Sequence, residues 1–315
     1  MLLRFLALLA TLAILTGACA QAPASQSSPA ISASPAGSAS AVAPPAFPVT
    51  VTDFQGKAVA IPAKPIRIVS IGASNTEFLF ALGAGDRVVA VDDFSDEPAA
   101  AKAKEKVGGV KPNVEKIVSL RPDLVVSLKI SDGSLERIAA QGIPILIVDP
   151  QSLADATRTA ELLGTATGAD GKGLARRIQD GLDAVRAKAA SLTKKRVFHE
   201  VDASDPTKLY TAGPGSFIHE LIGLAGGVNI AAGTASPFPQ LSPEEIIRRD
   251  PEIIVLGDAG YGMTIEQVQA RPGWSGVTAV RTKRIVPVDA NLMHRPGPRL
   301  AEAAEAYFRI IRETP

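Results

Sequence analysis

The sequence is poor in the residues on which several protein classes depend. Its 315 residues include one cysteine, three histidines and only 4% aromatic residues. A single cysteine excludes a framework of intramolecular disulfides and a zinc site built from several thiolates. Lys and Arg number 33 and Asp and Glu number 32, so no excess of charge favours binding to nucleic acid. The length is that of two domains, each large enough to bury a hydrophobic core.

Charged residues are absent between Arg4 and Asp53. The largely apolar run at 5–16 is too short to cross a bilayer, which takes about 20 residues. A basic residue followed by such a run is typical of a secretory signal peptide. Small residues precede Cys19, as they precede the lipidated cysteine of bacterial lipoproteins. We therefore predict a signal peptide over 1–18 and lipidation of Cys19, which anchors the chain to the membrane on its periplasmic or outer face.

The segment 19–47 consists mainly of Ala, Ser and Pro and carries no charge. Such a composition buries too little apolar surface to fold and is typical of flexible linkers. We predict a disordered tether that holds a folded body near the membrane and lets it reorient.

Alternating strand and helix patterns begin at Pro48. Continuous apolar strands with helical crossovers indicate parallel sheets that are covered on both faces. Helices are predicted between the strands, at 77–82, 135–141, 216–224 and 243–248. Strands are predicted at 67–71, 88–91, 124–128, 145–148, 197–201, 253–256 and 285–288.

One long helix is predicted between the two sets of strands. Apolar residues recur in steps of three or four from Leu174 to Leu192, which is the spacing of one helix face. The fold class predicted is therefore α/β, with two Rossmann-like lobes over 48–168 and 194–315. A single helix over 169–193 joins them, and a ligand cleft lies between the lobes.

A repeated motif relates the two lobes. Glu115 lies seven residues before Pro122, Glu244 lies seven residues before Pro251, and an acidic residue follows each proline. A capping Asn or Ser stands two positions before each glutamate, so both glutamates lie in the first turn of a helix, where the dipole favours them. Helix capping alone explains such acids. Alternatively, the carboxylates are matched points on the two lobes, and a partner with two basic sockets binds both.

Five segments in order make the chain from 48 to 315 resemble the substrate-binding proteins of ABC importers for iron-siderophores, haem and vitamin B12. They are 68–77, 113–123, 142–145, 225–230 and 295–299. The resemblance implies a monomeric binding protein without catalytic residues or a cofactor, whose ligand is a metal chelate carried as cargo. It also implies that Glu115 and Glu244 dock against arginines of the membrane permease.

The ligand is expected at loops that follow the carboxyl ends of strands, as in other open α/β sheets. Phe94, Tyr210 and Phe238 match positions where corrinoid-binding relatives carry aromatic residues. Val110 and Leu128 stand where such relatives can carry Trp, which leaves space for another bulky chelate. The candidate ligand-binding residues are Ser74, Asn75, Thr76, Phe94, Val110, Leu128, Tyr210, Ser216, Phe238, Tyr261, His294 and Arg295.

The three histidines are assigned different roles. His199 lies in a predicted strand and His219 in a predicted helix, so structural roles are predicted for both. His294 lies on a predicted cleft loop, where it could ligate a haem iron or form a hydrogen bond with a ligand. Arg295 beside it could bind a ligand carboxylate or phosphate, or fix its loop through a salt bridge.

Other functions are weighed against this prediction. The sequence has no Walker A loop, no G-x-S-x-G elbow and no H-E-x-x-H motif, which argues against an enzyme. A receptor for free zinc or manganese would bring several histidines to one ion, whereas the three here are scattered. A membrane-anchored ligand sensor of the same fold, without a permease, is opposed only by the paired glutamates. The sensor and the free-metal receptor therefore stay open as alternatives, and no metal site of the protein's own is predicted.

Overall fold

The structure is a computed structural model that describes residues 46–313. The predicted signal peptide, Cys19 and nearly all of the predicted tether lie outside the described residues. Within 46–313, no helix combines the length and the apolar character that crossing a membrane requires.

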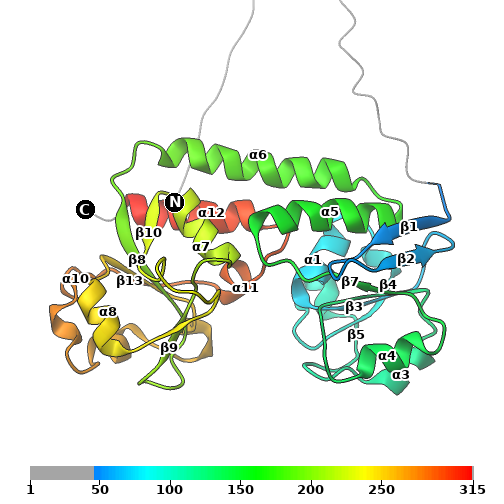
Figure 1. The fold of residues 1–315 in the computed structure, drawn as a ribbon, viewed down its shortest axis with the longest axis horizontal. Coiled ribbons are helices and arrows are strands. Elements are labelled where there is room, and N and C mark those ends of the chain that lie inside the picture. Colours follow the sequence, from blue (N-terminus) through cyan, green and yellow to red (C-terminus); the bar gives the residue numbers. More distant parts are fainter. Residues whose placement is uncertain (1–45, 314–315) are drawn as a thin grey trace, which may run out of the picture. The chain divides into compact units, whose positions relative to one another are not determined.

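The N-terminal lobe is built on a five-stranded parallel sheet (Figure 1). In chain order its elements are β1 (Val49–Thr52), β2 (Ala58–Ile61), β3 (Ile68–Ile71), α1 (Ala73–Ala81), η1 (Gly85–Arg87), β4 (Val88–Val91), α2 (Ala99–Lys102), β5 (Glu105–Lys106), α3 (Val114–Ser119), β6 (Leu124–Ser127), α4 (Ser134–Ala139), β7 (Ile145–Ile147) and α5 (Leu153–Thr167). The strand order is β5-β4-β3-β6-β7, and every neighbouring pair is parallel. Strands β3 and β6 are buried along their whole length, which explains their continuous apolar sequences.

The C-terminal lobe contains a six-stranded mixed sheet. Its elements are β8 (Lys195–Asp202), β9 (Leu209–Thr211), α7 (Phe217–Leu224), β10 (Gly227–Asn229), β11 (Gln240–Leu241), α8 (Pro243–Arg249), β12 (Ile253–Leu256), η2 (Ala259–Tyr261), α9 (Ile265–Gln269), η3 (Trp274–Gly276), α10 (Thr278–Arg281), β13 (Ile285–Pro287), α11 (Ala290–Met293) and α12 (Leu300–Arg312). Strands β10, β8, β12 and β13 pair in parallel, but β9 is antiparallel to both β8 and β11. The three strands predicted for this lobe, at 197–201, 253–256 and 285–288, match β8, β12 and β13 and are parallel as predicted, whereas the antiparallel β9 and its partner β11 were not predicted. The link between β8 and β9 is too short for a helical crossover, which takes about a dozen residues or more.

Helix α6 (Gly171–Ala189) spans both lobes, with α5 beneath one part of its length and α12 beneath the other (Figure 1), and it also contacts α7. Its buried face includes Leu174, Ile178 and Leu182, as the sequence spacing predicts. Gly181 lies at the crossing with α12, because a Cβ there would stand 2.6 Å from the Cβ of Ala301. Glycine lowers the stability of a helix, but at this position its missing side chain lets α12 approach α6.

A continuous hydrophobic cluster joins the lobes beneath α6. It contains Leu163 of α5, Ile178 of α6, and Leu221 and Phe308 of α7 and α12. Two further clusters lie within the individual lobes, one against each sheet. Packed apolar side chains, and not only the linker helix, therefore connect the lobes.

The repeated motif of the sequence is also a repeat in the structure. Arg121 and Asp250, which precede the two matched prolines, both adopt left-handed backbone conformations, with φ of 47° and 44°. The acids after the prolines also act alike: Asp123 accepts a hydrogen bond from the backbone N–H of Arg67 at 3.0 Å, and Glu252 accepts one from the N–H of Arg196 at 2.9 Å. Helices α3 and α8 therefore occupy equivalent places in the two lobes.

Candidate functional site

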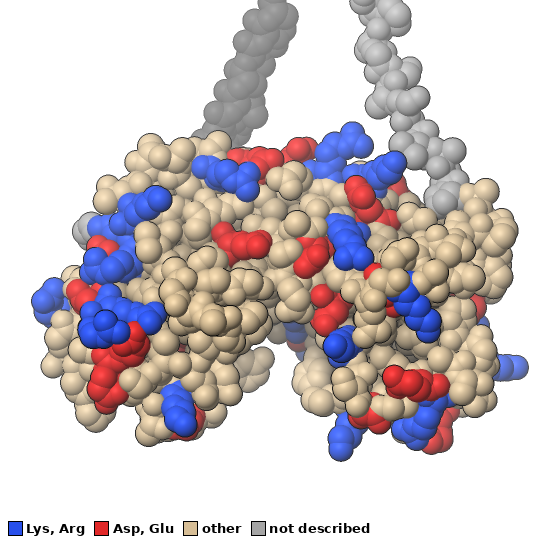
Figure 2. Space-filling model, viewed as in Figure 1, with Lys and Arg blue, Asp and Glu red and all other residues tan. Residues whose placement is uncertain are grey.

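A cavity of about 330 Å³ opens between the two lobes. Ser74, Asp92 and Phe94 line it from the N-terminal lobe, and Phe238 and His294 line it from the C-terminal lobe. In the space-filling view, a notch separates the lobes on the side away from α6 (Figure 2). The predicted cleft between the lobes is therefore present.

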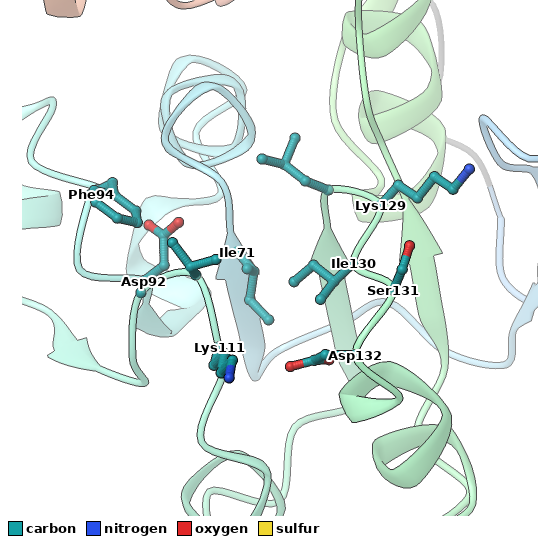
Figure 3. A pocket seen from close by; sticks show the side chains of 11 residues that line it. Ile71, Asp92, Phe94, Lys111, Lys129, Ile130, Ser131 and Asp132 are labelled. Carbon is teal, nitrogen blue, oxygen red and sulfur yellow. The ribbon is translucent and has the colours of Figure 1, made fainter. Parts of the chain in front are cut away.

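A second cavity of about 430 Å³ continues the cleft into the N-terminal lobe. It shares Asp92, Phe94 and Leu128 with the first cavity. Ile71 and Ile130 face each other across it, whereas the Lys129 side chain points away (Figure 3). Both volumes fall within the range of roughly 300–1,000 Å³ that is common for ligand pockets.

More than half of the predicted ligand residues line these cavities. Phe94 and Phe238 are 55% and 40% exposed, which is unusual for rings of this size, and they stand on opposite lobes. Two aromatic faces on opposite walls suit a flat or bulky ligand. The predicted residues that line a cavity are Ser74, Phe94, Val110, Leu128, Phe238, His294 and Arg295.

Three predicted ligand residues are instead buried and engaged within the protein. Asn75 donates to the carbonyl oxygen of Val148 at 2.9 Å. The Thr76 hydroxyl shares a hydrogen bond of 2.8 Å with that of Ser70, and Ser216 caps α7. Helix α1 begins one residue after β3, so Asn75 and Thr76 lie in a helix and not on the predicted loop, and both are buried.

Tyr210 and Tyr261 lie at the surface, where their side chains are 40% and 80% exposed. Tyr210 is in β9 and Tyr261 ends η2. Neither lines the two cavities of the cleft.

The interlobe cavity is also lined by two carboxylates that the sequence did not predict as ligand residues, Asp92 and Asp149. Asp92 accepts hydrogen bonds from the N–H of Gly72 at 2.8 Å and from the hydroxyl of Ser95 at 2.5 Å. Burial raises the pKa of Asp92 and also that of Asp149. Asp92 follows directly after β4, and Asp149 lies two positions after the end of β7. Ligands of open α/β sheets bind at the carboxyl ends of parallel strands, so this position could have identified both residues from the sequence.

Arg295 lines the cleft but is held by carboxylates of the other lobe. Its Nη1 lies 2.8 Å from Asp96 Oδ1 and 3.2 Å from Glu77 Oε1. Glu77, only 4% exposed, also accepts hydrogen bonds from Arg299 at 2.8 and 2.9 Å. We call Glu77, Asp96, Arg295 and Arg299 the interlobe network. The salt-bridge alternative for Arg295 matches this geometry, and the bridge joins two lobes and not only a loop.

The comparisons with known proteins agree with this architecture. Residues 68–292 match the periplasmic binding protein family. The chain belongs to this family. The uncharacterised ABC transporter substrate-binding lipoprotein YvrC of Bacillus subtilis (strain 168) is 37% identical to this periplasmic binding protein, over 84% of this chain and 86% of YvrC.

Two further relatives of this periplasmic binding protein are named for what they bind. The vitamin B12-binding protein of Vibrio vulnificus (strain CMCP6) is 32% identical, over 78% of this chain and 90% of that protein. The crystal structure of a possible iron-binding periplasmic solute-binding protein from Staphylococcus epidermidis superposes with a TM-score of 0.71 at 27% identity, over 79% of this chain and 100% of that one. Both are binding proteins by name, and the structure from Staphylococcus epidermidis shares the fold of this chain.

His294 of this periplasmic binding protein is partly buried in the cleft wall, and its Nε2 lies 2.8 Å from Nε2 of His199. Burial lowers the pKa of His294 to about 4, so the ring is neutral at pH 7. Among residues 46–313, no group of three or more His, Cys, Asp or Glu is arranged to hold a metal ion.

A second polar cluster lies in the C-terminal lobe. Arg271 contacts both carboxylate oxygens of the fully buried Glu200, at 2.5 and 2.7 Å, and stacks 4.7 Å from the centre of the Trp274 ring. Asp258 is 5% exposed, and its Oδ1 has no hydrogen-bond partner among the described residues. Burial, together with the charge of Glu200, raises the pKa of Asp258 to about 6. This cluster therefore holds an acid that keeps its proton to a higher pH than an ordinary aspartate does.

Replacing Asp258 with asparagine is expected to stabilise the protein at pH 7 and above. The folded-state pKa of about 6 exceeds the ordinary value of 3.8, so stability is lost as the pH rises from 3.8 through 6. Asparagine resembles the protonated acid at every pH, so we expect a gain of about 1–3 kcal/mol in the free energy of unfolding at pH 7.5 and none at pH 3.5. The free energies of unfolding of the variant and the unmodified protein are measured by urea unfolding at pH 7.5 and at pH 3.5.

Asp205→Asn is the matched control. Asp205 is exposed, and a hydrogen bond from Thr207 lowers its pKa, so its replacement should give no gain at pH 7.5. Equal stability of Asp258→Asn and the unmodified protein at pH 7.5 would contradict the prediction.

Proposed function

We propose that the protein is an extracytoplasmic substrate-binding protein that captures a metal chelate between its lobes and delivers it to an ABC-importer permease. The observation that carries the proposal is the hollow between the lobes, with Phe94 and Phe238 exposed on its opposite walls. A ligand that fills it would bury both rings, which favours a large, partly apolar chelate. No bond is made or broken in this role, so the protein acts as a carrier without catalytic residues or a cofactor of its own.

A corrinoid fits the charges of the interlobe cavity better than haem or an anionic ferric siderophore does, whereas the second cavity is lined by Lys111 and Lys129 as well as by Asp92 and Asp132. Asp92 and Asp149 line the interlobe cavity, and the charge of Arg295 is already balanced by the interlobe network. Haem propionates or a siderophore carboxylate would therefore meet carboxylates in this cavity without an unpaired cation. A corrin ring carries neutral amides, which hydrogen-bond to such walls. The vitamin B12-binding relative supports the same choice.

The proposed position of the protein is at the membrane, through a lipid on Cys19. The sequence motif at the N-terminus and the lipoprotein YvrC among the relatives support this part of the proposal. A lipid anchor and the tether 19–47 would keep a monomeric body close to the permease.

Glu115 and Glu244 are proposed to dock against basic residues of the permease. Both side chains are exposed and lie in the first turns of the equivalent helices α3 and α8. Arg137 stands 3.9 Å from Glu115, but the two side chains are 61% and 83% exposed, so the pair is weak. Hydrogen bonds from its own backbone N–H and from Ser242 lower the pKa of Glu244. Both carboxylates are thus available to a cationic partner.

A thermal-shift panel tests the proposed function. The panel contains cyanocobalamin, dicyanocobinamide, haemin, ferric siderophores of the hydroxamate and catecholate classes, Zn²⁺ and Mn²⁺. A ligand present at 100 times its Kd adds about 2.7 kcal/mol to the stability of the native state, which corresponds to a rise of roughly 5–10 °C in the melting temperature of a protein of this size. We expect that rise with the corrinoids.

The other members of the panel distinguish the alternatives. A rise with haemin or a siderophore alone would keep the chelate carrier and replace the corrinoid as its cargo. A rise with Zn²⁺ or Mn²⁺ alone would overturn the proposal in favour of a free-metal receptor. A corrinoid that binds but is not taken up by cells would favour a membrane-anchored sensor.

A further inference from the structure

Three side chains form a hydrogen-bonded chain from the cleft to the core. Nε2 of His294 lies 2.8 Å from Nε2 of His199, and Nδ1 of His199 lies 2.6 Å from the hydroxyl of Tyr307. His199 and Tyr307 are both fully buried, whereas His294 lines the interlobe cavity. The direction in which protons are donated along this chain decides what His294 offers to a ligand.

Tyr307 fixes the direction. Its hydroxyl has no other hydrogen-bond partner among the described residues, so its proton has an acceptor only if it is donated to Nδ1 of His199. The opposite direction would leave a buried O–H donor without an acceptor, which costs about 1–3 kcal/mol. Burial raises the pKa of Tyr307 well above its ordinary value, so the hydroxyl keeps its proton.

The tautomers of both histidines follow from this direction. A neutral imidazole carries one N–H and one acceptor nitrogen. Because Nδ1 of His199 accepts from Tyr307, its proton is on Nε2, and that N–H donates to Nε2 of His294. Burial lowers the pKa of both histidines, so a second proton is disfavoured. The proton of His294 is therefore on Nδ1, which has no hydrogen-bond partner among the described residues.

The acceptor nitrogen of His294 is closed off from the cleft. Besides the bond to His199, the backbone of Gly257 packs against Nε2 so closely that a Cβ on Gly257 would collide with it. A metal in the cleft would have to break the hydrogen bond to His199 and move the ring to reach this nitrogen. The Nδ1–H, by contrast, has no partner to give up among the described residues, and His294 lines the interlobe cavity.

We propose that His294 presents a fixed Nδ1–H donor to the cleft, through which it binds an acceptor oxygen on the periphery of the cargo instead of ligating the metal. His199 and Tyr307 are positioning residues that set this tautomer. The ligand part of the proposal rests on the proposed function, whereas the tautomer is a property of the protein alone. An amide carbonyl of a corrinoid is an acceptor of the required kind.

The tautomer is tested without any ligand, by a ¹H–¹⁵N correlation spectrum of the histidine rings at pH 7. The chain has only three histidines, and His219 is an internal control of opposite type. The side-chain amide of Asn229 donates to Nδ1 of His219 at 3.1 Å, so His219 carries its proton on Nε2. We expect an Nδ1–H tautomer for His294 and Nε2–H tautomers for His199 and His219. A His294 ring protonated on Nε2 would overturn the proposal.

Tyr307→Phe tests the role of the terminal donor. Removal of the hydroxyl leaves Nδ1 of His199 without its donor, so both tautomers of the His199–His294 pair should become populated. The signals of His294 should shift or broaden, while those of His219 stay unchanged. If the tautomer of His294 is the same in a folded Tyr307→Phe variant, Tyr307 does not set it.

Two amide substitutions test the contact with cargo. The amide of asparagine can occupy the place of Nδ1, whereas that of glutamine reaches the place of Nε2. We expect His294→Ala and His294→Gln to weaken binding of dicyanocobinamide about tenfold, and His294→Asn to retain most of the affinity. A visible spectrum of the bound corrinoid that shows nitrogen ligation, lost in His294→Asn, would overturn the proposal. If no chelate of the panel binds, the proposed function fails, but the spectrum of the free protein still decides the tautomer.

Discussion

Replacing Glu77 with glutamine is expected to lower the free energy of unfolding by about 3–5 kcal/mol. Glu77 is 4% exposed and joins α1 of the N-terminal lobe to Arg295 and Arg299 of the C-terminal lobe. A neutral amide would remove the carboxylate that accepts hydrogen bonds from Arg299, which is the largest cause of the raised pKa of that guanidinium. The removal of one partner from a buried pair costs far more than the loss of an exposed one. Equilibrium unfolding in urea, followed by circular dichroism, measures the change.

Glu115→Gln is the matched control for this prediction. It is the same substitution at a glutamate that is also next to an arginine, but its side chain is 83% exposed. We expect less than about 0.5 kcal/mol there. An equal effect of the two substitutions would mean that the interlobe network does not hold the lobes together.

Besides helix α6, three sets of contacts among residues 46–313 limit motion between the lobes, and the interlobe network is the first. The second is the hydrophobic cluster beneath α6. The third joins the first turn of α5 to α7, where Glu220 accepts a hydrogen bond from the backbone N–H of Leu153 at 2.8 Å. Because all three would have to change in a large rotation, we infer that ligand capture involves small movements of cleft side chains and loops.

The sequence predicted best those elements whose pattern is set by burial alone. The runs at 88–91 and 253–256 coincide with β4 and β12, because a strand buried on both faces must be apolar throughout. The face of α6 was equally clear, because a helix that packs along one side repeats its apolar residues every three or four positions. The N-caps of α3 and α8 were found because Asn113 and Ser242 act locally, on the backbone three residues ahead.

The features that the sequence did not reveal depend on contacts between distant segments. Arg295 meets Glu77 across 218 positions of the chain, so no local pattern could tell a ligand-binding arginine from a partner of the other lobe. The link of His199 to Tyr307 spans 108 positions. Strands β9 and β11 have two or three residues each, too few to show a period. The burial of Asn75 could not be predicted, because the sequence predicted a helix only from residue 77 whereas α1 begins at Ala73.

Reversing the charge of Glu115 and Glu244 together, with lysine at both positions, is expected to reduce uptake of the cargo about 100-fold or more, to the level of a strain that lacks the protein. Both carboxylates stand at the starts of equivalent helices, α3 and α8. If basic sockets of the permease bind them, each lysine replaces an attraction by a like-charge contact that costs several kcal/mol. Uptake of labelled cyanocobalamin by cells that carry the variant in place of the native gene measures the loss.

The affinity of the purified double variant for its ligand should remain unchanged, because neither glutamate lines the cleft cavities. The control is Glu136→Lys with Glu266→Lys, which makes the same change in net charge at exposed first-turn positions of α4 and α9. The two double variants have the same net charge and place their lysines at the same position of a helix. If only the Glu115 and Glu244 variant loses uptake, docking is assigned to this pair of glutamates. Equal losses would instead indicate a general attraction between the protein and its membrane partner, and a loss of ligand affinity would place the glutamates in the binding site.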